Sequence, residues 1–145
     1  MSQSVTYYAA AKLVYLNYGG HINFTNLAIK VADWKQKLSL SKGYDVLVDL
    51  RSLLSVDRPA DGADEFVKLQ EKLHHQHEPA RRMAILALSP EAFVFARIYE
   101  QMSQGHTPTE IEIFRTDPDA LAFLDVAAAG VDAYLASLGA GLTLR

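Results

Sequence analysis

The first residues that could do chemistry are histidines and carboxylates with helical spacing. Glu71 and His75 are four residues apart, and His74 and His77 are three apart. Either pair would share one face of a helix, where it could hold a metal ion. The same histidines stand just before Pro79, a residue type that ends helices, and cationic side chains stabilise a helix at that end. We therefore expect a structural role for them, with no metal and no other cofactor.

A second group of polar residues follows apolar segments of the chain. His21 follows an early segment, Asp49 and Arg51 follow the next, and Ser89 and Arg115 follow two later ones. If these segments are parallel strands, their carboxyl ends meet at one edge of the sheet, where ligands bind in open α/β sheets. These five residues are the candidate ligand-binding residues of the chain.

The same group allows two interpretations. In the first, Arg51 and Arg115 hold an anion, together with backbone N–H groups of a helix that begins at Ser89. In the second, Asp49 pairs with an arginine and fixes a loop, while Ser89 only caps its helix. Both interpretations stay open at the level of the sequence.

Motifs for catalysis are absent from the sequence. There is no Gly-x-Ser-x-Gly nucleophile motif and no glycine-rich phosphate loop. The cysteine count is zero, which excludes thiolate catalysis and cysteine-based metal sites. We therefore expect no enzymatic activity. The alternative is an enzyme that uses His21, Asp49 or Arg51.

Length and charge indicate the number of domains and the classes of partner. The chain has 145 residues, which fit one domain over 1–145. Its 14 Lys and Arg against 17 Asp and Glu give a net charge of −3, which argues against a nucleic-acid partner. No apolar run reaches the roughly 18–20 residues of a membrane-spanning helix, and the N-terminus lacks the features of a secretory signal. We expect a cytoplasmic protein without a membrane span.

The elements that must position these residues alternate along the chain. Alternating or continuous apolar patterns predict five strands, at residues 4–9, 12–18, 44–50, 82–88 and 110–114. Apolar residues at intervals of three or four predict five helices, which begin near residues 23–25, 61, 89, 116 and 131. The buried stripe of the first helix consists of Phe24, Leu27, Val31, Trp34 and Leu38.

This order of elements predicts an α/β fold. Strands that alternate with helices pair in parallel through right-handed crossovers, which gives a sheet covered by helices. The N-terminal hairpin adds one antiparallel strand at an edge. We therefore expect an open, mixed, mainly parallel five-stranded sheet flanked by helices, in the order β-β-α-β-α-β-α-β-α-α. In this fold 44–50 and 82–88 are parallel neighbours.

Three segments carry a resemblance to a known family. One reads DVLVDLR over residues 45–51, a second combines RMAILA at 82–87 with FVFAR at 93–97, and a third reads IFRTDPDALAFL over 113–124. Together they resemble SpoIIAA-like proteins, which share the fold of STAS domains and anti-sigma-factor antagonists and are compared with CRAL-TRIO lipid-binding domains. The resemblance covers about residues 4–124 and leaves 125–145 as a C-terminal helical tail.

The chain departs from this family where a phosphorylation site would lie. Phosphorylatable antagonists carry an Asp-Ser-Ser/Thr-Gly type segment at a helix start, whereas this chain reads VDRPADG over residues 56–62. Because this segment contains no hydroxyl side chain, we expect no phosphorylation switch of the partner-swapping kind.

The third predicted helix is apolar around most of its circumference. Phe93, Val94 and Ile98 fall outside the stripe that would face the sheet. Such a helix needs cover on two sides, which either the C-terminal helix or a second subunit would provide. These three residues are therefore the candidate interface residues.

The resemblance and the missing catalytic motifs together suggest a function. We expect a non-enzymatic regulatory or protein–protein interaction module of the SpoIIAA/STAS-like type, with a homodimer or another protein as partner. The alternative is a domain of the CRAL-TRIO-like kind that binds a small molecule, an anion or a lipid.

Overall fold

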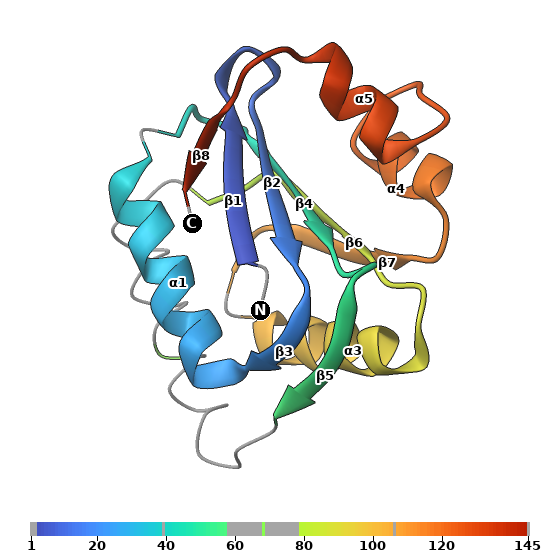
Figure 1. The fold of residues 1–145 in the computed structure, drawn as a ribbon. Helices are drawn as coiled ribbons and strands as arrows, with labels where there is room; N and C mark the ends of the chain where they lie inside the picture. Colours follow the sequence, from blue (N-terminus) through green and yellow to red (C-terminus); the bar gives the residue numbers. More distant parts are fainter. Residues whose placement is uncertain (1–2, 39, 58–67, 69–78, 106, 145) are drawn as a thin grey trace.

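A mixed six-stranded sheet forms the centre of the protein (Figure 1). The structure, a computed structural model, describes residues 3–38, 40–57, 68, 79–105 and 107–144. The strand order across the sheet is β7-β6-β4-β2-β1-β8. In chain order these strands are β1 Gln3–Tyr8, β2 Leu13–Tyr18, β4 Asp45–Asp49, β6 Arg82–Leu86, β7 Glu110–Phe114 and β8 Leu142–Leu144.

Four of the six strands run in parallel. β2 pairs with β4, β4 with β6 and β6 with β7, each in parallel. The expected parallel contact between 44–50 and 82–88 is therefore present, as the register of Val46 opposite Met83 shows. β1 is antiparallel to β2, as expected for the N-terminal hairpin. The general α/β class matches the prediction.

The predicted number of strands in the sheet was wrong. β8 adds a sixth strand, antiparallel to β1, where we expected only a helical tail. It has three residues and follows Gly139 and Gly141, so its sequence carries almost no periodic signal. Glycine at 141 has a steric reason, because a Cβ there would lie 2.6 Å from Cγ2 of Thr6.

A second, two-stranded sheet extends the first. β3 (Gly20–Asn23) follows β2 almost directly, β5 (Leu53–Asp57) follows the turn after β4, and the two pair in parallel. The sequence analysis predicted neither strand. Both are short, and β5 has mostly half-exposed or exposed side chains, so neither shows a continuous apolar run.

The described helices agree closely with the expected ones. They are α1 Phe24–Lys37, α3 Pro90–Ser103, α4 Asp117–Phe123 and α5 Val131–Ser137. The helix expected from residue 61, with the histidines at 74, 75 and 77, lies outside the described residues apart from Lys68. None of the helices in the described ranges has the length and apolar character that a membrane crossing requires.

The helices divide the interior into two cores on opposite faces of the sheet. Alternating strand residues point to opposite faces, so Val46 and Val48 of β4 enter one core and Leu47 enters the other. The first core lies between the sheet, α1 and α3, and the second lies between the sheet, α4 and α5. Each face therefore positions a different set of polar residues.

Candidate functional site

Asp49 is a buried carboxylate at the carboxyl end of β4. Only 3% of its surface is exposed. Two residues after Leu47, it lies on the sheet face that carries the second core. The hydroxyl of Tyr15, on the neighbouring strand β2, donates to Asp49 Oδ2 at 2.5 Å, and the backbone N–H of Arg51 donates to Oδ1 at 3.0 Å.

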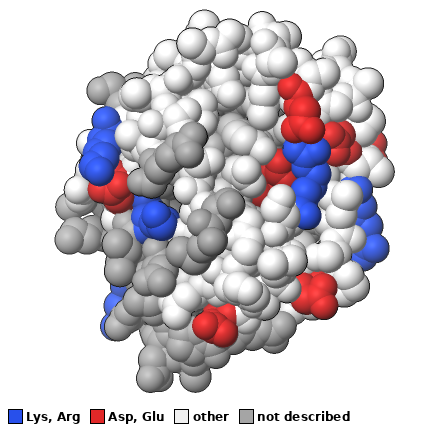
Figure 2. Space-filling view, in the orientation of Figure 1, with Lys and Arg blue, Asp and Glu red and all other residues white. Residues whose placement is uncertain are grey.

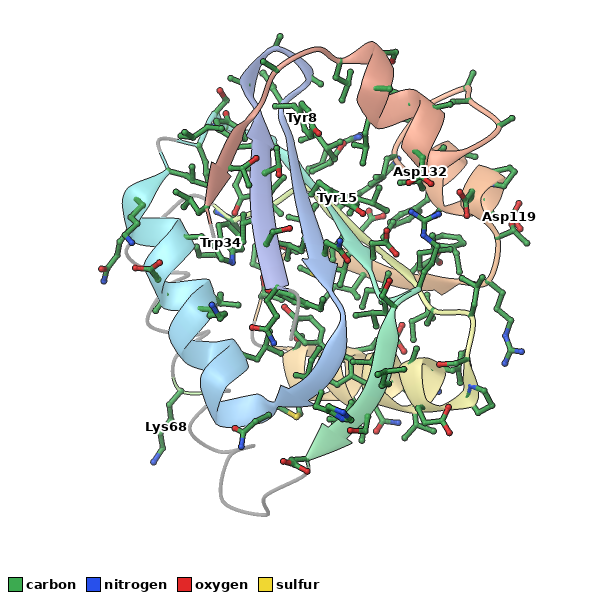
Figure 3. All side chains as sticks on the ribbon, in the orientation of Figure 1. Tyr8, Tyr15, Trp34, Lys68, Asp119 and Asp132 are labelled. Carbon is green, nitrogen blue, oxygen red and sulfur yellow. The ribbon has the colours of Figure 1, made fainter. Side chains whose placement is uncertain are left out.

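Arg51, in the turn after β4, connects Asp49 to the C-terminal helices. Its Nε donates to Asp49 Oδ1 at 3.0 Å, and one terminal nitrogen donates to Asp49 Oδ2 and Asp132 Oδ1, both at 2.8 Å. The other terminal nitrogen lies 3.8 Å from Asp117 Oδ2. We call Tyr15, Asp49, Arg51, Asp117 and Asp132 the Arg51 cluster; Figure 3 labels Tyr15 on β2 and Asp132 on α5.

The Arg51 cluster connects the two short helices α4 and α5 to the sheet. Asp117 is the first residue of α4, and Asp132 lies in the first turn of α5. The backbone N–H of Val131 also donates to Asp117 Oδ2, at 2.9 Å. Both carboxylates therefore stand at positive helix ends while they also face the guanidinium. In Figure 2 basic and acidic atoms touch one another on the right of the view, where Figure 1 places α4 and α5.

The electrostatics of the cluster keep Asp49 charged and Tyr15 neutral. Burial by itself would raise the pKa of Asp49, but the hydrogen bonds from Arg51 and Tyr15 outweigh burial and hold it below its usual range. Burial, together with the neighbouring Asp49 carboxylate, raises the pKa of the Tyr15 hydroxyl. With three carboxylates around one guanidinium, Arg51 is occupied by acceptors of its own chain. This geometry favours the loop-fixing interpretation over an anion pocket.

The other predicted ligand-binding residues lie apart from the cluster. His21 is exposed on β3, and its Nδ1 hydrogen-bonds with Ser55 Oγ of β5. Ser89 caps α3, because its Oγ accepts from the backbone N–H of Ala92 at 3.1 Å. Arg115 is exposed after β7. Within the described part of the chain, no hydrogen bond or ion pair joins these three residues to the Arg51 cluster.

The predicted interface residues have three different environments. Phe93 is half-buried, and the guanidinium carbon of Arg115 lies 4.6 Å from the centre of its ring. Val94 is 38% exposed, and Ile98 packs against the first core. α3 packs against β5 and β7, whereas α4 and α5 cover the opposite face of the sheet. The C-terminal helix therefore does not cover α3, contrary to one of the two expectations.

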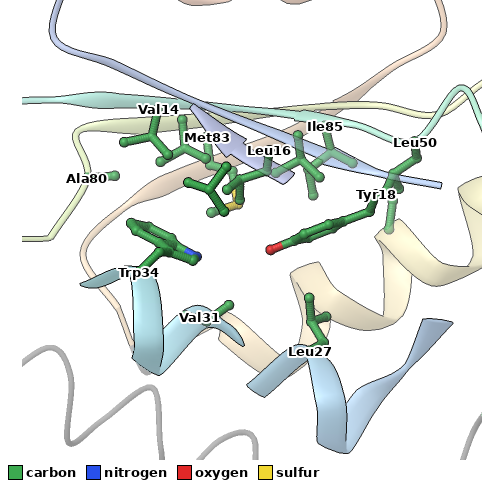
Figure 4. Close-up of a cluster of buried hydrophobic side chains, with 14 of the residues drawn as sticks. Val14, Leu16, Tyr18, Leu27, Val31, Trp34, Leu50, Ala80, Met83 and Ile85 are labelled. Carbon is green, nitrogen blue, oxygen red and sulfur yellow. The ribbon is translucent and has the colours of Figure 1, made fainter. Parts of the chain in front are cut away.

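A cavity that no sequence signal predicted lies between α1 and the sheet. Its volume is about 50 Å³. Figure 4 shows Tyr18, at the end of β2, and Trp34, on α1, on opposite sides of this region. The described residues that line it are Leu16, Tyr18, Leu27, Val31, Trp34, Lys35, Tyr44, Val46, Val48, Ala80, Met83, Ile85, Phe95, Tyr99, Thr107, Thr109 and Ile111.

Two polar atoms in this cavity make no hydrogen bond of good geometry with the part of the chain that the structure describes. Tyr18 and Trp34 are each 3% exposed. Neither the Tyr18 hydroxyl nor the Trp34 indole nitrogen makes a hydrogen bond of good geometry with a described residue. The indole N–H nevertheless lies near enough to the hydroxyl to lower the pKa of Tyr18, although burial, the larger effect, raises it. In the sequence both residues belong to ordinary apolar patterns, so no local signal marks them as functional.

The stability of the protein should fall in acid through the Arg51 cluster. The pKa of folded Asp49 lies below its ordinary value of 3.8, so the unfolded chain binds a proton there first. The stabilisation is complete above about pH 5 and is lost as the pH falls through the folded pKa. Urea unfolding between pH 2.5 and 6 should show a flatter pH dependence for Asp49→Asn than for the unmodified protein. The same pH dependence of the unfolding free energy in both proteins would contradict this role of Asp49.

No protein-family model matches the chain, and the searches of curated proteins and of solved structures also gave no match. The resemblance to SpoIIAA-like proteins therefore stays a prediction that depends on the three segments quoted above. A metal site finds no candidate among the described residues, where no three histidines or carboxylates are grouped suitably.

Proposed function

We propose that this protein is a small-molecule-binding domain whose site is the cavity between α1 and the sheet. The observation that carries the proposal is the cavity itself, with two unpartnered polar atoms in its walls. Protein interiors are packed at the density of organic crystals, and nearly all buried polar groups are hydrogen-bonded. A core that departs from both rules at the same point loses stability unless a bound molecule restores the contacts.

The composition of the cavity wall supports this function. Its described residues are mostly aliphatic and aromatic, with a few polar groups from Tyr18, Lys35 and the threonines 107 and 109. Sites for small molecules have this composition: an apolar lining with a small number of placed polar groups. The proposal corresponds to the alternative that the sequence left open, a domain that binds a small molecule or lipid.

Filling the cavity should abolish binding without unfolding the protein. Val31 lines the cavity, so the ring in Val31→Phe would occupy the space that a ligand needs. Trp34 is the only tryptophan of the chain, and its fluorescence reports on the cavity directly. We expect saturable fluorescence changes with carboxylates and alcohols of four to six carbons, and affinities at least tenfold weaker in Val31→Phe.

The control is the same substitution outside the cavity. Val94 is partly exposed on α3 and does not line the cavity. Val94→Phe should therefore titrate like the unmodified protein. If no probe of the series gives a saturable change, or if Val31→Phe binds as tightly as the unmodified protein, the cavity is not a binding site.

A second candidate function is contact with another protein, including a second copy of this chain. It is favoured by three exposed apolar side chains: Leu54 on β5 (66%), Leu88 after β6 (52%) and Val94 on α3 (38%). Native mass spectrometry of the purified protein tests both candidates, because it detects a retained small molecule and counts subunits. A dimer that Val94→Asp dissociates would support the second candidate, and a monomer at high concentration would exclude self-association.

A further inference from the structure

Two hydrogen-bond donors enter the cavity from opposite walls. The hydroxyl of Tyr18 and the indole nitrogen of Trp34 point toward one another in Figure 4, one from the sheet and the other from α1. Both side chains are more than nine-tenths buried, and neither polar atom makes a hydrogen bond of good geometry with a described residue. An indole N–H can only donate, and a phenol O–H can donate as well. A ligand that carries hydrogen-bond acceptors would satisfy both donors.

The described part of the cavity wall carries charge of one sign. Of the described residues that line the cavity, Lys35 is charged and none carries a carboxylate. The Lys35 ammonium lies 5.7 Å from the centre of the Trp34 ring, over its face. Burial lowers the pKa of Lys35, which means that its charge is incompletely solvated. A negative ligand would compensate for that loss of solvation.

We infer that the cavity binds a short-chain apolar carboxylate. Its oxygens accept hydrogen bonds from Tyr18 and Trp34, Lys35 supplies the opposite charge, and the hydrocarbon chain lies among side chains such as Leu16, Val31 and Met83. This inference depends on the proposed function, because it names the class of ligand for the same cavity.

The volume of the cavity limits the length of that chain. A water molecule needs roughly 10–15 Å³ of space for its centre, so about 50 Å³ accommodates only a few such groups. A chain much longer than that of hexanoate would extend beyond this space. We therefore expect affinity to rise from acetate to butyrate and to level off or fall beyond hexanoate.

The test compares butyrate with butanol and butylamine, which have similar chains and different head groups. Titrations followed by Trp34 fluorescence at constant pH and ionic strength should give at least tenfold tighter binding for butyrate than for butanol. Butylamine should not bind. Tyr18→Phe should weaken butyrate binding about tenfold, because a buried hydrogen bond to a charged group is lost. Lys35→Gln should remove the preference for butyrate over butanol.

Two control variants change the same residue types outside the cavity. Tyr8→Phe alters a tyrosine that packs against the second core, and Lys37→Gln alters a lysine that pairs with Asp33 on the surface of α1. Both should bind butyrate like the unmodified protein.

A measurement without ligand tests the unpartnered hydroxyl. Tyr18→Phe should raise the urea midpoint of the ligand-free protein, because it removes a buried polar group that makes no hydrogen bond. In saturating butyrate the unmodified protein should have the higher urea midpoint, because its hydroxyl then binds the ligand. A lower midpoint for ligand-free Tyr18→Phe, with no change in Tyr8→Phe, would mean that water already satisfies the hydroxyl and would overturn the inference.

The remaining outcomes separate the inference from the proposed function. Suppose that butyrate and butanol bind equally well and that Val31→Phe binds neither. This result would support the cavity as a binding site and overturn the carboxylate assignment. Absence of binding by every probe would overturn both.

Discussion

Replacement of Arg51 by methionine is expected to lower the free energy of unfolding by about 3 kcal/mol. The substitution leaves Asp49 buried with Tyr15 as its remaining side-chain donor, and it places Asp117 and Asp132 near one another without a cation between them. Removal of one partner of a buried ion pair costs more than the pair itself contributes, because the other charge loses its compensation.

Urea unfolding at pH 7 measures this effect, and a surface pair provides the control. Arg97 pairs with Glu100 at 2.8 Å within α3, where both side chains are partly exposed. Arg97→Met should cost less than about 1 kcal/mol, as is usual for an exposed pair. In the double variant Asp49→Asn, Arg51→Met, part of the stability should return, because the uncompensated buried charge is gone. A cost for Arg51→Met no larger than that for Arg97→Met would refute the role of the Arg51 cluster.

Truncation of Leu121 to alanine is expected to cost about 3 kcal/mol as well. Leu121 of α4 is fully buried and belongs to the second core, together with Leu47 and Leu86 of the sheet. A seven-residue helix has little stability of its own, so α4 depends on this packing to stay on the sheet. The lost contacts and the residual void both contribute to the cost.

The exposed Leu142 on β8 is the matched control for this substitution. Leu142→Ala should change the free energy of unfolding by no more than about 0.5 kcal/mol. Because Leu121 lies on the face opposite the cavity, ligand titrations followed by Trp34 fluorescence should be unchanged in Leu121→Ala under native conditions. Similar costs for both leucine variants would show that α4 is not held by its buried face.

The two faces of the sheet have different physical characters. The face under α4 and α5 is packed and carries the compensated charges of the Arg51 cluster. The face under α1 and α3 contains the cavity and the unpartnered polar atoms of Tyr18 and Trp34. The Arg51 cluster therefore stabilises the face under α4 and α5, and the face under α1 and α3 carries the proposed ligand site.

The sequence by itself was sufficient to predict those elements whose signals depend on neighbouring residues. It predicted the strand at 110–114, the cap of α3 at Ser89 and the parallel neighbours 44–50 and 82–88. Caps, helical periodicity and apolar runs depend on residues a few positions apart, and the alternation of strands with helices implies parallel pairing.

Only the tertiary structure decided which residues meet. Arg51 donates a hydrogen bond to Asp132, which lies 81 positions further along the chain. β8 pairs with β1, from the opposite end of the chain. The cavity arises because α1 and β2 approach each other with Tyr18 and Trp34 on facing sides, although each residue has the pattern of an ordinary core position. Contacts between distant residues depend on how the elements pack, and a single sequence contains no periodicity that reports such packing.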